Sequence, residues 1–106
     1  MYAIIRRYSL KTAQNQKTVD DLKRRLDEGF LPKVQDVQGF HGYYAMNVGG
    51  KGLVTITVCD DKAGADESTR RAAEFVKNDP LKDQLGSPEI IEGDLLIAKE
   101  AAIGTR

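Results

Sequence analysis

The chain has 106 residues, the size of one domain with one hydrophobic core, and 41% of them are apolar, which excludes a disordered polar chain. Lys plus Arg equals Asp plus Glu at 16 each, so the net charge is zero, and this balance excludes the basic excess of a nucleic-acid binder. A single cysteine, Cys59, excludes an internal disulfide, and no apolar run reaches the roughly 20 residues of a membrane span, so we expect a cytoplasmic protein with no membrane partner.

The first element expected is a strand over residues 1–8, which are rich in aromatic and β-branched side chains. Ile4 and Ile5 are adjacent in it, and neighbouring residues of a strand point to opposite faces. Both faces of this strand therefore need apolar cover.

A kinked helix is expected next, opening at Thr18, whose hydroxyl is a good N-terminal cap. Its apolar residues recur in steps of three and four, which marks one helical face: Val19, Leu22, Leu26, Phe30, Val34 and Val37. Pro32 lacks a backbone donor and clashes with the carbonyl four residues back, so we expect a kink or break near Gly29 to Pro32.

A β-hairpin follows the helix. Strands are expected over residues 40–48 and 53–59, joined by the glycine-rich turn 49–52, which favours an antiparallel pair. The later strand alternates between two sets of side chains: Val54, Ile56 and Val58 on one face, and Thr55, Thr57 and Cys59 on the other. A shift of one residue in the turn exchanges the set that joins a given face of the earlier strand, so this pairing stays open.

A second helix and a last strand complete the order. The helix is expected over residues 66–77, capped by Asp66, with small inward residues that let it lie close to a sheet. The last strand is expected over residues 89–99, and its consecutive apolar residues 95–98 again require cover on both faces. The tail, residues 100–106, is expected to be loosely ordered.

This β-α-β-β-α-β order predicts an α+β fold of ferredoxin-like type, a single domain over residues 1–106 with a four-stranded antiparallel sheet. Two helices cover one face of such a sheet, yet the first and last strands carry apolar residues on both faces. A second copy of the same sheet is the simplest cover, because most homo-oligomers close with two-fold symmetry. We therefore expect a homodimer in which two sheets form a dimeric α/β barrel.

With this order, the chain resembles the dimeric α/β barrel superfamily, and within it the antibiotic biosynthesis monooxygenase-like proteins. The resemblance also includes the Gly39-Phe40 entry into the second strand and the helix over residues 66–76. A Gly-Phe-x-Gly-Tyr-Tyr stretch is similar to that of short uncharacterised bacterial members, and it is formed here by Gly39, Phe40, Gly42, Tyr43 and Tyr44.

The resemblance implies one fold but several activities, among them cofactor-free oxygenases, haem degraders, chlorite dismutases and lactone isomerases. Haem degraders of this fold pair a histidine ligand with an asparagine and a tryptophan. This chain has no tryptophan, and its one histidine, His41, starts a strand. Haem degradation is therefore disfavoured, and with one cysteine and one histidine we expect neither a cofactor nor a metal ion.

Candidate site residues gather on the second strand. His41, Tyr43 and Asn47 alternate along one face and are the catalytic candidates, with His41 suited to accept a proton near neutral pH. Arg7 is a candidate for holding a carboxylate or enolate oxygen, and Tyr44 for contacting the substrate. The opposite face of the strand is expected to carry Phe40, Tyr44, Met46 and Val48. A competing interpretation is that the polar strip only satisfies hydrogen bonds at the sheet end or at the dimer interface.

Two functions of different classes stay open, so the chain is not assigned as an enzyme at this point. One is a protein that binds or oxidises a small conjugated or enolisable molecule without a cofactor. The other is a non-catalytic dimeric binding or stress-associated module. A cavity of about 300 Å³ or more between sheet and helices would favour the first, and a filled interior the second.

Overall fold

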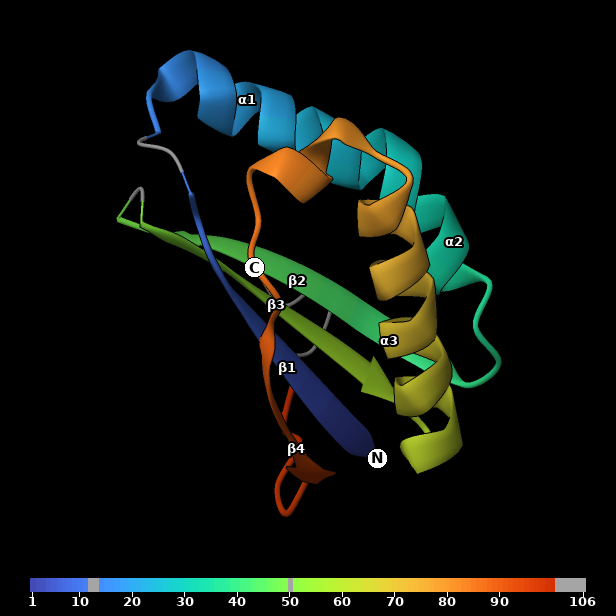
Figure 1. Cartoon of the computed structure of the whole chain (residues 1–106). Coiled ribbons are helices and arrows are strands. Elements are labelled where there is room, and N and C mark those ends of the chain that lie inside the picture. The colour runs from blue at the N-terminus through green and yellow to red at the C-terminus, as the bar shows by residue number, and fades with distance from the viewer. Residues whose placement is uncertain (12–13, 50, 101–106) are drawn as a thin grey trace, which may run out of the picture.

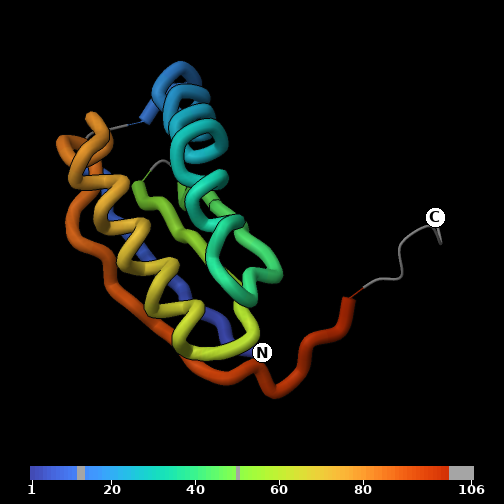
Figure 2. Tube along the Cα trace, turned by 90° about the vertical axis from the view of Figure 1, so that its right-hand side faces the viewer, coloured from blue at the N-terminus to red at the C-terminus, as the bar shows by residue number. Residues whose placement is uncertain are grey.

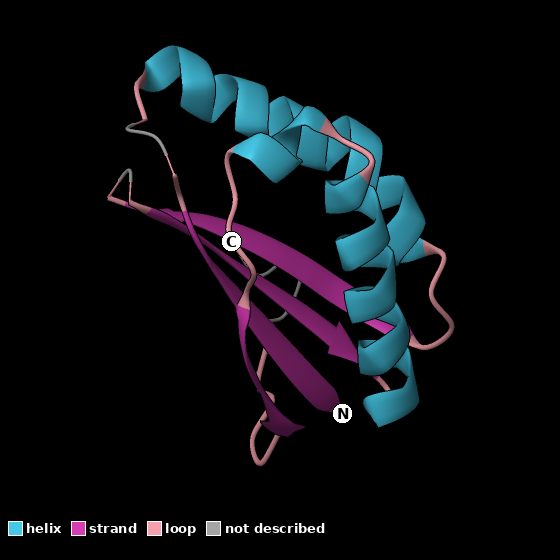
Figure 3. Cartoon of the chain, in the orientation of Figure 1, coloured by secondary structure: helices cyan, strands magenta, loops and turns pink. Residues whose placement is uncertain are grey.

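The computed structural model, which describes residues 1–11, 14–49 and 51–100, has two layers: an antiparallel sheet and the helices on one of its faces (Figures 1 and 3). The strands are β1 (Tyr2–Ser9), β2 (Phe40–Val48), β3 (Gly52–Cys59) and β4 (Glu89–Asp94), in the spatial order β2-β3-β1-β4. The helical elements are α1 (Gln16–Arg25), a π-helical turn η1 (Leu26–Phe30), α2 (Leu31–Gln35), α3 (Lys62–Lys77) and a 3-10 turn η2 (Pro80–Asp83). The expected ferredoxin-like fold is confirmed, and no helix in the described ranges is long and apolar enough to cross a membrane.

The helical segment from α1 to α2 is continuous but changes its winding in the middle. It begins two residues before the expected start, because Asn15 is the cap and Thr18, the third helical residue, completes a reciprocal capping box. The wider π turn η1 comes just before Pro32, which lies in the first turn of α2. The irregularity expected near Gly29 to Pro32 is therefore a π turn and not a break.

Helix α3 begins at Lys62, four residues before the expected start. Its cap is Asp61, whose side chain accepts a hydrogen bond from the backbone N–H of Gly64 at 3.1 Å. A Cβ at Gly64 would lie 3.0 Å from the Cβ of Cys59 and 3.1 Å from the carbonyl oxygen of Gln38. The glycine therefore serves close packing at the start of the helix.

Strand β4 ends five residues earlier than expected. Leu96 and Ile97 lie beyond it and are almost fully exposed. The prediction that the apolar run 95–98 is a strand covered on both faces is therefore wrong for the single chain. Of the expected loose tail, residues 101–106 lie outside the described residues.

The face of the sheet under the helices is partly polar. On β3 it carries Thr55, Thr57 and Cys59, each at most 3% exposed. Tyr43 of β2 pairs with Thr57, so the polar set of β3 joins the Tyr43 face, and the pairing left open by the sequence is resolved. Burial raises the pKa of the Cys59 thiol, which keeps it protonated and makes it a packing residue rather than a nucleophile.

The other face of the sheet is mostly apolar, and none of the described helices lies over it (Figure 3). Its side chains come from all four strands: Ile5, Tyr44, Met46, Val48, Val54, Ile56, Val58 and Ile91. Four of these are at least 44% exposed: Tyr44, Met46, Val48 and Ile91. We call this surface the open face. Apolar patches of this kind on a protein surface mark interaction sites.

Candidate functional site

A β-bulge at the start of β2 changes the alternation of its side chains. The register shifts between Phe40 and Gly42, so Phe40 pairs with Cys59 and packs against the apolar core on the same side as Tyr43. The expectation that Phe40 lies opposite Tyr43 is therefore wrong. Tyr43 and Asn47 do share one face, as the alternation predicts.

The bulge separates His41 from the other two catalytic candidates, Tyr43 and Asn47. Its side chain is half-exposed, and its Nε2 atom contacts the carboxylate of Asp60, just before α3. His41 therefore lies at the end of the sheet, and the structure does not bring it together with Tyr43 or Asn47.

Arg7 and Tyr44 both lie on the open face of the sheet. Arg7 pairs with Glu89, with 2.5 Å between Nη2 and Oε1, and both of these side chains are exposed. Tyr44 is exposed as well. The two substrate-binding candidates are thus on the opposite side of the sheet from Tyr43 and Asn47.

Tyr43 and Asn47 line a cleft of about 390 Å³ between β2 and the segment formed by α1, η1 and the start of α2. We call it the α1–β2 cleft. Most of its wall is apolar and comes from Val19, Leu22, Leu26, Leu31 and Leu53. Lys23 and Asp27, both exposed, are the charged residues that line it. Asp27 belongs to the π turn, and such turns are frequent at functional sites.

A buried arginine occupies the centre of the helix-covered face. Arg6 is 1% exposed. Its guanidinium donates hydrogen bonds to four hydroxyl oxygens: Thr57 at 2.7 Å, Thr69 at 3.0 Å, Ser68 at 3.2 Å and Thr55 at 3.3 Å. All four partners are neutral, and no carboxylate of the described residues forms an ion pair with Arg6. A buried charge without a counter-ion costs free energy, so this arrangement is a candidate for function.

Two tyrosines lie close to Arg6, and burial raises the pKa of both Tyr8 and Tyr43, so both phenols stay protonated. Tyr43 also packs edge-on against Phe30, with 5.3 Å between the ring centres. The space enclosed by these side chains is nearly filled, with about 10 Å³ free. A ligand therefore fits beside this centre and not in it.

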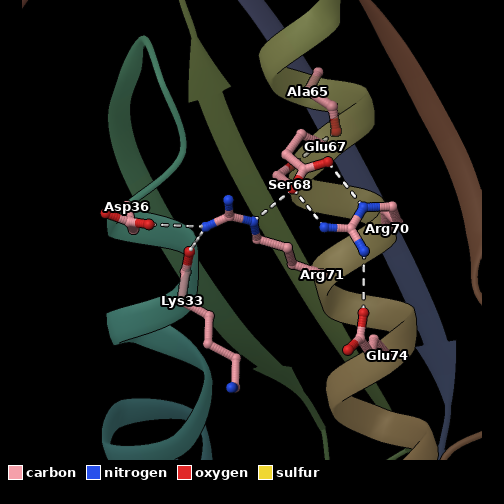
Figure 4. Close-up of polar contacts among 8 residues, drawn as sticks. All are labelled: Lys33, Asp36, Ala65, Glu67, Ser68, Arg70, Arg71 and Glu74. Atoms are coloured by element: carbon pink, nitrogen blue, oxygen red, sulfur yellow. Dashed lines mark hydrogen bonds and ion pairs between the residues drawn. The ribbon is translucent and has the colours of Figure 1, made fainter.

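A larger hollow, of about 660 Å³, is an open groove between α2 and α3. Most of the charged side chains around it bind one another (Figure 4). Glu67 accepts hydrogen bonds from Arg70 at 2.6 Å and Arg71 at 2.7 Å, and these contacts lower the pKa of Glu67 to about 2. Arg71 also donates to the carbonyl oxygen of Lys33 at 2.7 Å. Arg71 thus joins α3 to α2, and the charges of Arg70, Glu74 and Asp36 in the groove are already paired.

Arg6 and Asp27 are the main residues that sequence reasoning missed. Strand alternation does separate Arg6 from Arg7, and it groups Arg6 with Ile4 and Tyr8. The sequence did contain one signal: Arg6 needs acceptors, and the hydroxyls of Thr55 and Thr57 lie on one face of β3. Asp27 had no such signal, because it depends on the π turn.

No family model matches the chain, and no curated protein does. Solved structures match it over nearly its whole length. It is similar to NE2512, a protein of unknown function from Nitrosomonas europaea, with 25% identity and a TM-score of 0.69 over 95% of this chain and 94% of that one.

Two structures of enzymes are also similar. One is a monooxygenase from the gene ActVA-Orf6 of Streptomyces coelicolor in complex with nanaomycin D, with 15% identity and a TM-score of 0.69 over 95% of this chain and 92% of that one. The other is SnoaB, a cofactor-independent oxygenase from Streptomyces nogalater, with 11% identity and a TM-score of 0.62 over 92% and 94%. The likeness to the monooxygenase-like barrel proteins is therefore confirmed as a likeness of fold.

Proposed function

We propose that the protein binds a small, largely apolar organic molecule in the α1–β2 cleft and oxidises it with O₂ without a cofactor. The observation that carries this proposal is that Tyr43, Asn47 and Asp27 place a phenol, an amide and a carboxylate in one apolar cleft of about 390 Å³. The fold shared with a monooxygenase and a cofactor-independent oxygenase supports the same class of reaction. A single cysteine suits a reducing compartment, so we place the protein in the cytoplasm.

The three polar groups have complementary roles in such a reaction. Asp27 accepts a proton as the substrate enolises. Tyr43 keeps its own proton because burial raises its pKa, so it donates a hydrogen bond to the enolate oxygen rather than acting as a base. The amide of Asn47 is a second donor. His41 does not line this cleft, so its catalytic role stays a prediction.

An anthrone is the simplest substrate of this chemistry. Loss of a proton from its methylene carbon gives an aromatic enolate, which transfers electrons to O₂. The methylene becomes a carbonyl whose oxygen comes from O₂, and the second oxygen atom leaves as water with the two hydrogens. The substrate supplies all four electrons, so the reaction needs no external reductant.

The working unit in this proposal is a homodimer. Its interface is the open face, because all four strands contribute apolar side chains to that face and none of the described helices covers it. An isologous pair of open faces would bury both at once and form the expected barrel. Arg7 and Tyr44 would then lie between the two sheets.

A second candidate function is a non-catalytic dimeric module. One observation favours it: the space around Arg6, Tyr43 and Phe30 is nearly filled, so the chain fills the centre of its own interior. The two candidates differ in whether the α1–β2 cleft takes a ligand and turns it over.

Oxygen uptake with anthrone, corrected for autoxidation without protein, tests the proposal. Tyr43→Phe should lower kcat by about tenfold or more, because an oxyanion donor acts mainly on the transition state. Asp27→Asn should also lower kcat. Tyr2→Phe is the matched control, since it removes a phenol that binds Glu92 outside the cleft, and should keep the wild-type rate.

Each alternative result has a definite meaning. If wild-type protein binds anthrone without oxygen uptake above the background, the oxidation is wrong and the binding module is favoured. If Tyr44→Phe loses activity while Tyr43→Phe keeps it, the site lies on the open face and the α1–β2 cleft is the wrong place.

A further inference from the structure

A second cleft lies beside Arg6 and shares no lining residue with the α1–β2 cleft. Its volume is about 280 Å³, and it lies between α3, β1 and the segment that leads into β4. In Figure 2 this segment runs along α3 on the side away from α1 and α2. We call this second cleft the α3–β4 cleft. Ala73, Val76 and Leu85 make part of its wall apolar.

The charged side chains that line this cleft are all positive. Its charged lining residues are Arg6, Lys77 and Lys82, and no Asp or Glu of the described residues lines it. The two lysines are exposed, whereas Arg6 is buried. A cleft lined by one sign of charge attracts ligands of the other sign.

Arg6 is held in place before any ligand arrives. Four hydroxyl oxygens fix its guanidinium, and of their residues only Thr69 lines the cleft. An arginine does not lose its proton in proteins, so this buried charge keeps its need for an anion. Burial makes the attraction stronger than it would be in water, because the surroundings have a low dielectric constant.

We propose that the α3–β4 cleft binds the carboxylate of a small organic acid with an apolar body, and that Arg6 is the counter-ion of this carboxylate. The carboxylate takes the place of the Thr69 hydroxyl as an acceptor from Arg6 Nη1, and Thr69 then donates its own proton to it. The apolar body lies against Ala73, Val76 and Leu85, and Lys77 and Lys82 attract the acid to the mouth. The site is separate from the α1–β2 cleft, so its occupancy does not depend on the reaction proposed there.

Titration of the wild-type protein with 1-naphthoate and with the neutral 1-naphthamide tests the charge requirement. The two ligands have nearly the same shape, so the amide controls for apolar binding. Naphthoate should bind about tenfold tighter or more, since a charge-assisted hydrogen bond is stronger than a neutral one. The side-chain NMR signal of Arg6 Nε–H should shift with naphthoate and stay in place with the amide.

Variants test the assignment to Arg6. Arg6→Met should abolish the preference for naphthoate over naphthamide, whereas Arg24→Met, an equal charge loss on the exposed face of α1, should keep it. The exposed pair Lys77→Met and Lys82→Met should weaken naphthoate binding several-fold and reduce its salt dependence. If Arg6→Met does not fold, the two lysine substitutions still test whether naphthoate binds at this cleft.

Three results would overturn the proposal. Equal affinity for naphthoate and naphthamide would show that charge plays no part. A naphthoate titration that leaves the Arg6 Nε–H signal unmoved would place the acid on the surface lysines alone. Loss of naphthoate binding in Arg7→Met but not in Arg6→Met would place the acid on the open face.

Discussion

Gly29, in the π turn η1, packs directly against α3. A Cβ at this position would lie 2.7 Å from the Cε1 atom of Phe75, a buried ring of α3. Gly29→Ala should therefore lower the free energy of unfolding by about 1–3 kcal/mol, the usual cost of overpacking a filled core. Denaturant unfolding measures this.

A double-mutant cycle and a control make this test specific. In a Phe75→Leu background the added methyl group has room, so Gly29→Ala should cost less there than in the wild type. Gly93→Ala, where nothing lies within 4 Å of the added Cβ, should leave stability nearly unchanged. Equal costs of Gly29→Ala in the two backgrounds would contradict the contact with Phe75.

Shifts of one residue along a strand also explain which of the candidate site residues could be placed correctly from the sequence. Tyr43 and Asn47 share a face as alternation predicts, because β2 is regular after Gly42. His41 does not join them, since a bulge has no reliable signal in one sequence. Arg6 and Arg7 differ by one position, and only the pairing with β3 shows which of them is buried.

Among the elements, the ion-pair cluster of Glu67, Arg70 and Arg71 on α3, which Arg71 joins to α2, gives a pH-dependent prediction (Figure 4). Hydrogen bonds from Arg70 and Arg71 lower the pKa of Glu67 from 4.5 to about 2. A lowered pKa in the folded state means that ionised Glu67 stabilises the fold. This stability is fully present above pH 4.5 and is lost as the pH falls towards 2.

Comparison of wild type with Glu67→Gln by denaturant unfolding at several pH values checks this. The wild type should be the more stable protein above pH 4.5, and its advantage should shrink steadily towards pH 2. An advantage that stays constant over this range would mean that the Glu67 carboxylate is not coupled to folding.

The order and type of the elements could be predicted from the sequence, whereas several of their ends could not. Both early helix starts arise from caps that lie before the expected ones, at Asn15 and Asp61. The late strand was predicted too long because its apolar run 95–98 has a strand-like composition. In the described residues that run has only the hydrogen bond from the Leu95 N–H to the Met1 carbonyl oxygen, because β1 begins at Tyr2 and offers no further pairing, and composition alone does not show this.

At the scale of the whole molecule, the open face predicts assembly. Ile91 is exposed on this face in the single chain and pairs with Ile5 across the sheet. Ile91→Glu should therefore leave the fold of the monomer intact. At micromolar protein concentration it should convert the dimer into a monomer, because it places a charge in an apolar interface. Sedimentation equilibrium measures the change.

Ala63→Glu, an equal change on the exposed start of α3, is the control and should stay dimeric. A wild-type protein that is monomeric at micromolar concentration would contradict the dimer. A dimer unaffected by Ile91→Glu would show that the open face is not the interface.

The central claim is that a small organic ligand binds under the helices, in the α1–β2 cleft. Intermolecular NOEs between isotope-labelled protein and bound anthraquinone, the oxidation product of anthrone, test it most directly. We predict NOEs from the ligand to the ring of Tyr43 and the methyl groups of Leu22, which line that cleft. NOEs to Tyr44 and Ile56 on the open face, or no binding at the solubility limit of the ligand, would contradict the claim.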